Sequence, residues 1–226
     1  MRVVVLSASP NTDGLTAACA RAAVEAAAGA AAGVDAREIR LNDAGVGLCR
    51  ACGNGWGTCQ TEHRCQIEDG FQAIHRQVVE ADALVLVTPV YWGEMSESAK
   101  AFADRLRRCE ASAGNASRLK DRPVIAVAAA GGSGGGLVSC LGSMERLILH
   151  LGARPFDLVS VNRWNRQEKI RAIGESAAAV VRGDGRGSRQ VLRRIKLAIV
   201  ASLWTLLTPG QRLHMLRAPD RRRNPG

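Results

Sequence analysis

Residues 1–16 read MRVVVLSASPNTDGLT, and this stretch decides the fold. Residues 3–6 (VVVL) are apolar and mostly β-branched with no polar alternation, which predicts a strand buried on both faces of a parallel sheet. Residues 7–16 then crowd hydroxyls, an amide and a glycine into one turn, and an alanine-rich segment follows directly. The pattern therefore predicts a strand, a polar loop and the start of a helix.

The polar loop has two interpretations. Free N–H groups at a helix N-terminus, with the helix dipole behind them and hydroxyls beside them, form an anion site that suits a phosphate. Alternatively, Thr12 or Asp13 simply caps the helix. The first turn alone favours neither interpretation.

Composition and charge bound the class of protein. With 226 residues, the chain is long enough for one well-buried domain and an appendage. Its net charge is +10, but residues 182–226 hold eleven Lys and Arg against two Asp and Glu, which gives +9 and leaves +1 for residues 1–181. Because the basic residues are concentrated in the tail, the high isoelectric point does not make the body a nucleic-acid binder, and we expect no nucleic-acid partner.

Cellular location is predicted from the termini and the cysteines. Met1 and Arg2 lead directly into the first strand, and no run reaches the roughly eighteen apolar residues of a membrane-spanning helix. We therefore expect a cytoplasmic protein without a signal peptide. Four of the seven cysteines lie between residues 49 and 65, which in a cytoplasmic chain indicates metal or redox chemistry rather than a disulfide framework.

Apolar runs and helical spacing alternate along the chain. Strands are predicted at 3–6, 34–41, 83–88, 124–130 and 155–161, and helices at 14–32, 68–80, 96–108, 137–151 and 166–181. Five strands alternating with five helices predict a three-layer α/β domain with a five-stranded parallel sheet. In such a sheet the ligand lies beyond the carboxyl ends of the strands, where the strand order reverses.

Two further loops are expected at that edge. Residues 89–95 (PVYWGEM) place Tyr91 and Trp92 beside Gly93, which suits a flat ring ligand; alternatively, the two aromatic side chains pack back over the sheet edge. Residues 131–136 (GGSGGG) allow the backbone to approach a ligand closely. This second loop does not fit G-x-G-x-x-G in any register, so it is not a dinucleotide fingerprint.

Three segments carry a family resemblance: SASPNTDGLT at 7–16, ADALVLVTPVYWGEMSESAKAFADR at 81–105, and the glycine loop at 131–136. With CQIED at 65–69, they resemble the flavodoxin-like NAD(P)H-dependent oxidoreductases, which include FMN reductases, quinone reductases and iron–sulfur flavoproteins. The resemblance covers about residues 1–180. It implies a flavodoxin-like FMN-binding domain over 1–182 that passes electrons from NADH or NADPH, through FMN, to a small acceptor such as a quinone, flavin or nitro compound. It also implies a homodimer or homotetramer.

The resemblance assigns cofactor residues by position. The flavin phosphate would be bound by Ser9, Asn11, Gly14, Leu15 and Thr16; the ribityl chain and ring would be flanked by Pro89, Val90, Tyr91, Trp92 and Gly93; and the pocket would be closed by Gly131, Gly132 and Ser133. Asn11 stands where many members have Arg, so phosphate binding would rely on neutral donors and the helix dipole. Because a flavin carries out electron transfer itself, no catalytic residue is expected, and the four histidines are expected to be surface or helix residues.

The cysteine segment leaves several alternatives open. Cys49, Cys52, Cys59 and Cys65 could hold a [4Fe–4S] cluster or a zinc ion. The resemblance supports a cluster, although the gap 53–58 is wider than in iron–sulfur flavoproteins. Without a metal, these residues would be thiols of a substrate loop, with a redox-active Cys49/Cys52 pair. The runner-up function is thus an iron–sulfur flavoprotein electron carrier, followed by a non-enzymatic thiol or metal sensor. Cys19, Cys109 and Cys140 are expected to be ordinary helix residues.

Residues 183–226 are predicted to be a linker followed by a basic amphipathic helix and a disordered end. Leu192, Ile195, Ile199, Leu203 and Leu206 follow helical spacing, and Pro209 and Gly210 end the helix. The apolar stripe would dock on the domain or on a dimer partner. Alternatively, it would lie on an anionic lipid surface as a peripheral membrane contact.

Overall fold

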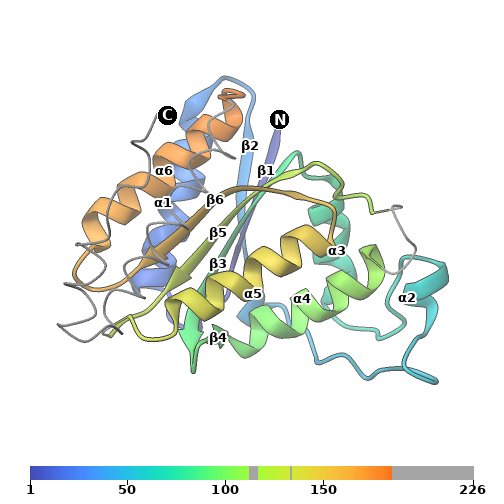
Figure 1. Cartoon of the computed structure of the whole chain (residues 1–226). Coiled ribbons are helices and arrows are strands. Elements are labelled where there is room, and N and C mark those ends of the chain that lie inside the picture. The colour runs from blue at the N-terminus through green and yellow to red at the C-terminus, as the bar shows by residue number, and fades with distance from the viewer. Residues whose placement is uncertain (112–116, 133, 185–226) are drawn as a thin grey trace, which may run out of the picture. The chain divides into compact units, whose positions relative to one another are not determined.

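The computed structural model describes residues 1–111, 117–132 and 134–184 (Figure 1). The predicted amphipathic helix lies outside these residues, as does Ser133. The predicted domain boundary at residue 182 therefore stays a prediction.

Five parallel strands form the sheet in the order β2-β1-β3-β5-β6. They are β1 (Arg2–Ser7), β2 (Asp35–Arg40), β3 (Ala83–Tyr91), β5 (Pro123–Ala129) and β6 (Arg154–Val161). The predicted five-stranded parallel sheet is confirmed. A short strand β4 (Glu94–Met95), which the sequence pattern did not predict, pairs antiparallel with the end of β3.

Helices cover both faces of the sheet, so the predicted three layers are confirmed. Figure 1 shows α1 and α6 on one side and α3, α4 and α5 on the other. Their bounds are α1 (Leu15–Ala30), α3 (Phe71–Glu80), α4 (Glu97–Glu110), α5 (Leu137–His150) and α6 (Arg166–Val181). Two short helices, η1 (Leu41–Asp43) and α2 (Thr58–Thr61), lie between β2 and α3.

Burial explains why the strand patterns differ. The inner strands β1, β3 and β5 are buried on both faces along most of their length, which is why they read as continuous apolar runs. By contrast, β2 reads DAREIR and is half-exposed throughout. The alternating residues of β2 therefore agree with its place at the edge of the sheet.

The packing of α1 against α6 depends on small side chains. Ala20, Ala23 and Ala27 of α1 are completely buried. On α6, a Cβ added at Gly174 would lie 3.3 Å from the Cβ of Ala26 and 3.4 Å from the carbonyl oxygen of Ala22. Because protein interiors are close-packed, this helix pair has no room for larger groups.

The strand order creates the crevice in which a ligand can bind. The chain leaves β1 through α1 to reach β2 on one side, and it then crosses β1 to place β3 on the other side. The order therefore reverses between β1 and β3, which is the ligand position in open parallel sheets. The loops after β1, β3 and β5 all emerge at this carboxyl edge.

Enlarging a buried alanine of α1 should destabilise the domain. Ala23→Leu inserts three heavy atoms where α1 packs against the core, so we expect a loss of about 1–3 kcal/mol in the free energy of unfolding, measured by urea titration. Ala28→Leu, an exposed position on the same helix, is the matched control and should change it by less than about 0.5 kcal/mol. Equal losses in both variants would contradict the packing described above.

Candidate functional site

The first loop of the site, between β1 and α1, is shaped for an anion. Gly14 is the N-cap of α1, and among the described residues no side chain caps this helix and none in its first turn is acidic. The interpretation that Thr12 or Asp13 caps the helix is therefore wrong. The first N–H groups of α1 have no partner within the helix. Ser9 and Thr16 are buried beside the loop, and the Ser9 hydroxyl accepts the Asn11 N–H at 3.2 Å, which leaves its own hydrogen to donate.

Two arginines add positive charge to this loop. Arg21 Nη1 donates to the carbonyl of Thr12 at 3.1 Å, and Arg40 Nη2 donates to the carbonyl of Pro10 at 3.4 Å. Arg40 reaches the loop because the parallel register pairs it with Ser7, the last residue of β1. Arg40 is also paired with Asp43 at 2.6 Å, so the positive charge near the loop comes mainly from Arg21. Neither arginine was predicted from the sequence, although the place of Arg40 at the carboxyl end of an edge strand was a usable signal.

The second predicted loop contains a tight hairpin. Strand β3 continues to Tyr91 and pairs back with β4 through Tyr91↔Glu94. Between them, Trp92 (φ 52°) and Gly93 (φ 84°) both adopt left-handed backbone, as a two-residue type I′ turn requires. The Trp92 side chain is fully exposed and Tyr91 is 39% exposed. Packing of Trp92 over the sheet edge is therefore wrong, and its ring is available to a ligand.

The glycine loop after β5 touches this hairpin backbone to backbone. Gly136 has φ 81°, and a Cβ there would lie 2.5 Å from the Cα of Gly93. Ser139, in the first turn of α5, donates its hydroxyl toward the carbonyls of Gly93 at 2.8 Å and Gly136 at 3.0 Å. Gly131 and Gly132 are exposed, with nothing within 4 Å of an added Cβ. Ser133, the third residue predicted for this loop, lies outside the described residues.

A buried serine joins the first loop to the hairpin. Ser96, the N-cap of α4, donates its hydroxyl to the carbonyl of Ala8 at 2.8 Å, and its N–H donates to Thr88 Oγ1 at 3.0 Å. The N–H of Ala8 donates in turn to the carbonyl of Val87 at 3.0 Å. All three loops predicted to bind FMN are therefore linked by short hydrogen bonds or backbone contacts.

The cysteine segment forms a separate site on α4. Cys49, Cys52, Cys59 and Cys65 line one cavity together with Arg105 and Arg108. Figure 1 shows α2 of this segment beside α4, on the side away from the sheet. The structure thus brings the four thiols together. Across 1–111, 117–132 and 134–184, however, no three His, Cys, Asp or Glu side chains are already arranged to hold a metal ion.

A buried ion pair holds both ends of this segment. Arg105 donates Nη1 and Nη2 to the Asp69 carboxylate at 2.6 and 2.9 Å, and it also donates to the carbonyls of Gly47 and Ile67 at 3.1 and 3.3 Å. Its guanidinium lies 4.4 Å from the centre of the Phe71 ring. Burial raises the pKa of Asp69, but the hydrogen bonds from Arg105 and two backbone N–H groups outweigh it, so the net pKa lies below its ordinary value.

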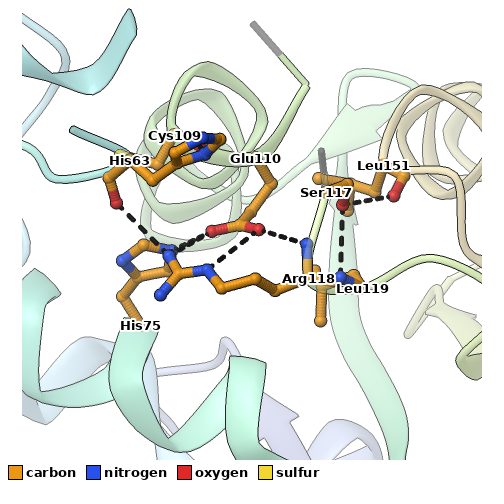
Figure 2. Close-up of polar contacts among 8 residues, drawn as sticks. All are labelled: His63, His75, Cys109, Glu110, Ser117, Arg118, Leu119 and Leu151. Atoms are coloured by element: carbon orange, nitrogen blue, oxygen red, sulfur yellow. Dashed lines mark hydrogen bonds and ion pairs between the residues drawn. The ribbon is translucent and has the colours of Figure 1, made fainter. Parts of the chain in front are cut away.

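A second polar cluster holds the middle of the segment against the end of α4. Figure 2 shows the buried Glu110 carboxylate between His75 and Arg118, at 2.8 and 2.5 Å. Arg118 also donates to the carbonyl of His63 at 3.3 Å, and His63 Nδ1 lies 2.7 Å from the carbonyl of Cys109. The sequence analysis missed this cluster. His75 is a helix residue, as expected, but it is a buried one with a structural role.

The remaining cysteines are unreactive core residues. Burial raises the pKa of Cys19, Cys109 and Cys140 to about 12 in each case. Since the thiolate is the reactive form of cysteine, these three side chains carry no chemistry near neutral pH. Their prediction as ordinary helix residues is confirmed.

The family model for NADPH-dependent FMN reductases matches residues 1–165. The chain belongs to this family. The name of this family gives FMN as the cofactor and NADPH as the electron donor, which agrees with the cofactors expected from the resemblance.

Individual relatives of this FMN reductase family member agree on the fold. The chain is 34% identical over 107 residues to an iron–sulfur flavoprotein of Methanocaldococcus jannaschii, a match that covers 47% of this chain and 52% of that protein. It is 12% identical to the FMN-dependent NADH-azoreductase of Bacillus anthracis, solved in complex with FMN, with a TM-score of 0.60 over 80% of this chain and 99% of that one. A flavodoxin, WrbA-like protein of Agrobacterium tumefaciens gives 0.54 at 19% identity, covering 80% of this chain and 98% of that one. The flavodoxin-like fold is confirmed. The chain spans about half the length, or less, of the curated relatives it matches.

Removing the Ser96 hydroxyl should loosen the loops at the carboxyl edge of the sheet. Ser96→Ala leaves the buried Ala8 carbonyl without its donor and removes the cap of α4, so we expect a loss of about 1–3 kcal/mol in the free energy of unfolding. Urea titration measures this loss. The matched control Ser98→Ala, two residues along, removes an exposed bond to Asn42 and a 3.4 Å contact with the Ser96 hydroxyl. It leaves the bonds of Ser96 to Ala8 and Thr88 in place, so it should cost much less.

Acid should weaken the cluster around Glu110. Burial by itself raises the pKa of Glu110. The hydrogen bonds from His75 and Arg118 have the larger effect, so the net pKa is lowered to about 2. The unfolded chain, with an ordinary pKa of 4.5, therefore binds more protons, and this stabilisation is lost as the pH falls from 4.5 toward 2.

We therefore expect Glu110→Gln to be less stable than wild type at pH 7 and to lose less stability between pH 4.5 and 2, as measured by urea titration at each pH. Glu25→Gln, an exposed position on α1, is the control. The same pH slope in Glu110→Gln and wild type would contradict this assignment.

Proposed function

We propose that this protein transfers a hydride or electrons from NADH or NADPH, through bound FMN, to a small acceptor such as a quinone, a free flavin or a nitro compound. The observation that carries the proposal is the joining of an uncapped helix N-terminus to an exposed aromatic hairpin at one sheet edge. The first feature suits the flavin phosphate, and the second suits the flavin ring. FMN, when bound, supplies the redox chemistry.

The chain's own residues then have positioning roles. The phosphate would lie at the N-terminus of α1, among the N–H groups of Gly14, Leu15 and Thr16 and the hydroxyls of Ser9 and Thr16. Arg21 and Arg40 donate hydrogen bonds to backbone carbonyls of the same loop, and Arg21 adds positive charge beside it. Pro89 and Val90 carry the hairpin whose Tyr91 and Trp92 would flank the ring. Gly131 and Gly132, which present no side chain, would close the pocket without blocking a flat acceptor.

Assembly and location are also proposals. We propose a homodimer or homotetramer, supported by the exposed Trp92 of the hairpin and the exposed Val138 and Leu149 of α5. A cytoplasmic location is supported by the seven cysteines, which are all thiols. Every helix in the described ranges is too short or too polar to cross a bilayer. Peripheral contact of residues 183–226 with anionic lipid rests on the sequence pattern.

A second candidate function is electron transfer by an iron–sulfur flavoprotein. Two observations favour it: the four cysteines line one cavity, and the curated relatives carry that name. The donor set fits, because four thiols are the ligands that a [4Fe–4S] cluster requires. Cys49, Cys52, Cys59 and Cys65 would hold the cluster, which would supply one-electron chemistry when bound. A zinc ion or a redox-active Cys49/Cys52 pair are the other uses of these thiols.

The first experiment is an absorption spectrum of the full chain purified without oxygen, with iron and sulfide assayed on the same sample. A two-band flavin spectrum without iron supports the reductase alone. A broad iron–sulfur shoulder with stoichiometric iron and sulfide supports the electron carrier. Absence of flavin even after incubation with FMN would overturn the main proposal.

Truncating Trp92 should weaken FMN binding without weakening the fold. Its ring is fully exposed, so Trp92→Ala removes no packing within the domain, whereas loss of ring stacking should lower FMN affinity up to roughly tenfold. Fluorescence titration with FMN measures the affinity, and thermal melting of the apoprotein checks the fold. Trp164→Ala, another exposed tryptophan beyond β6, is the matched control and should bind FMN like wild type. Unchanged affinity in Trp92→Ala would contradict the assignment of the hairpin.

A further inference from the structure

Arg105 carries a buried hydrogen-bond donor that the fold does not use. Its side chain is fully buried, and its Nη1 and Nη2 groups are engaged by Asp69 and by the carbonyls of Gly47 and Ile67. Its Nε–H is the single buried side-chain donor without a partner in the described ranges. Leaving such a donor unsatisfied destabilises the folded state, so its presence calls for an acceptor.

Arg105 borders a cavity that is lined by sulfur. Cys49, Cys52, Cys59 and Cys65 line the same cavity. Because an arginine guanidinium stays protonated at any physiological pH, Arg105 places a permanent cation beside these thiols.

Neutral thiols would use this donor poorly. A thiol sulfur is a weak hydrogen-bond acceptor, whereas a thiolate bound to a metal keeps negative charge and accepts N–H groups well. Asp69 holds the guanidinium plane by two parallel bonds, and α4 holds the side chain at its Cα. The orientation of Nε–H is thus set before any ligand enters.

We propose that Arg105 donates its Nε–H to a cysteine sulfur of an iron–sulfur centre held by Cys49, Cys52, Cys59 and Cys65, and thereby raises the reduction potential of that centre. This inference rests on the second candidate function. Reduction adds one electron to a centre that is already negative, and a fixed cationic donor stabilises the reduced form more than the oxidised form. No proton or further reactant is required.

The test compares substitutions of two neighbouring arginines of α4. The full chain is reconstituted anaerobically with ferrous iron and sulfide, and iron content and reduction potential are measured for wild type, Arg105→Lys and Arg107→Lys. Lysine keeps a cation opposite Asp69 but lacks the Nε–H. Arg107 is half-exposed and does not line the cavity, so Arg107→Lys is the matched control.

We expect all three proteins to bind iron. At a fixed ambient potential, the ratio of reduced to oxidised centre should fall about tenfold in Arg105→Lys, which corresponds to ~59 mV for one electron. Arg107→Lys should titrate like wild type. An iron-loaded Arg105→Lys with the wild-type potential would overturn the inference while leaving the iron–sulfur candidate standing. Failure of wild type to bind iron and sulfide would overturn both, whereas the reductase proposal is judged separately by its flavin content.

A spectroscopic measurement covers the case in which Arg105→Lys does not fold. Wild-type protein is labelled with ¹⁵N at the Nε of arginine, reconstituted with iron and sulfide, and reduced. Pulsed EPR should then show a ¹⁵N nucleus coupled to the reduced centre, because the donor contacts a ligand sulfur. Absence of any coupled arginine nitrogen would overturn the inference without the need for a variant.

Discussion

The parallel pairing of β1 with β3 is the constraint on which the proposed flavin site depends. Because β2 lies on the other side of β1, the chain leaves β1 and β3 in opposite directions, and the two loops separate at the carboxyl edge. The crevice between them is therefore a product of strand order rather than of any one side chain. The buried Ser96 then fixes its width, since it bonds the carbonyl of Ala8 after β1 and the hydroxyl of Thr88 near the end of β3.

The two sites of the protein are built by different physical means, and α4 is common to both. At the proposed flavin site, the loops are held mainly by serine hydroxyls, backbone N–H groups and glycines that allow close approach, with Arg21 and Arg40 bonded to the first loop. The cysteine segment is instead held by buried charges: Arg105 with Asp69, and Glu110 with His75 and Arg118. The difference suits the ligands, because a helix N-terminus already carries the partial positive charge that a phosphate needs, whereas a long loop needs strong long-range bonds to be held against a helix.

Much of the fold was predictable because its signals are local. Residues 3–6, 83–88 and 124–130 are apolar runs that only a doubly covered strand explains, and all became inner strands. The hairpin was missed because β4 has two residues, too few for any periodicity, and because Trp92 is an unusual residue for left-handed backbone. The ion pairs that hold the cysteine segment were missed because their partners are distant in the sequence. Asp69 and Arg105 are 36 residues apart, and His75 and Glu110 are 35 residues apart. From the sequence alone, charged residues on a predicted helix are expected at the surface, because their buried partners lie elsewhere in the chain.

The sequence by itself determined the alternation of strands and helices, the sheet edge at β2, the three loops at the carboxyl edge and the family, because each of these depends on contiguous residues. Only the tertiary structure decided how those loops meet: that no side chain in the described ranges caps α1, that Arg40 arrives beside β1 through strand register, and that Trp92 points into solvent. It also decided that four cysteines share a cavity with an unpartnered donor on Arg105. The physical reason is that burial and hydrogen-bond satisfaction are properties of surroundings assembled from distant segments, and no local pattern records them.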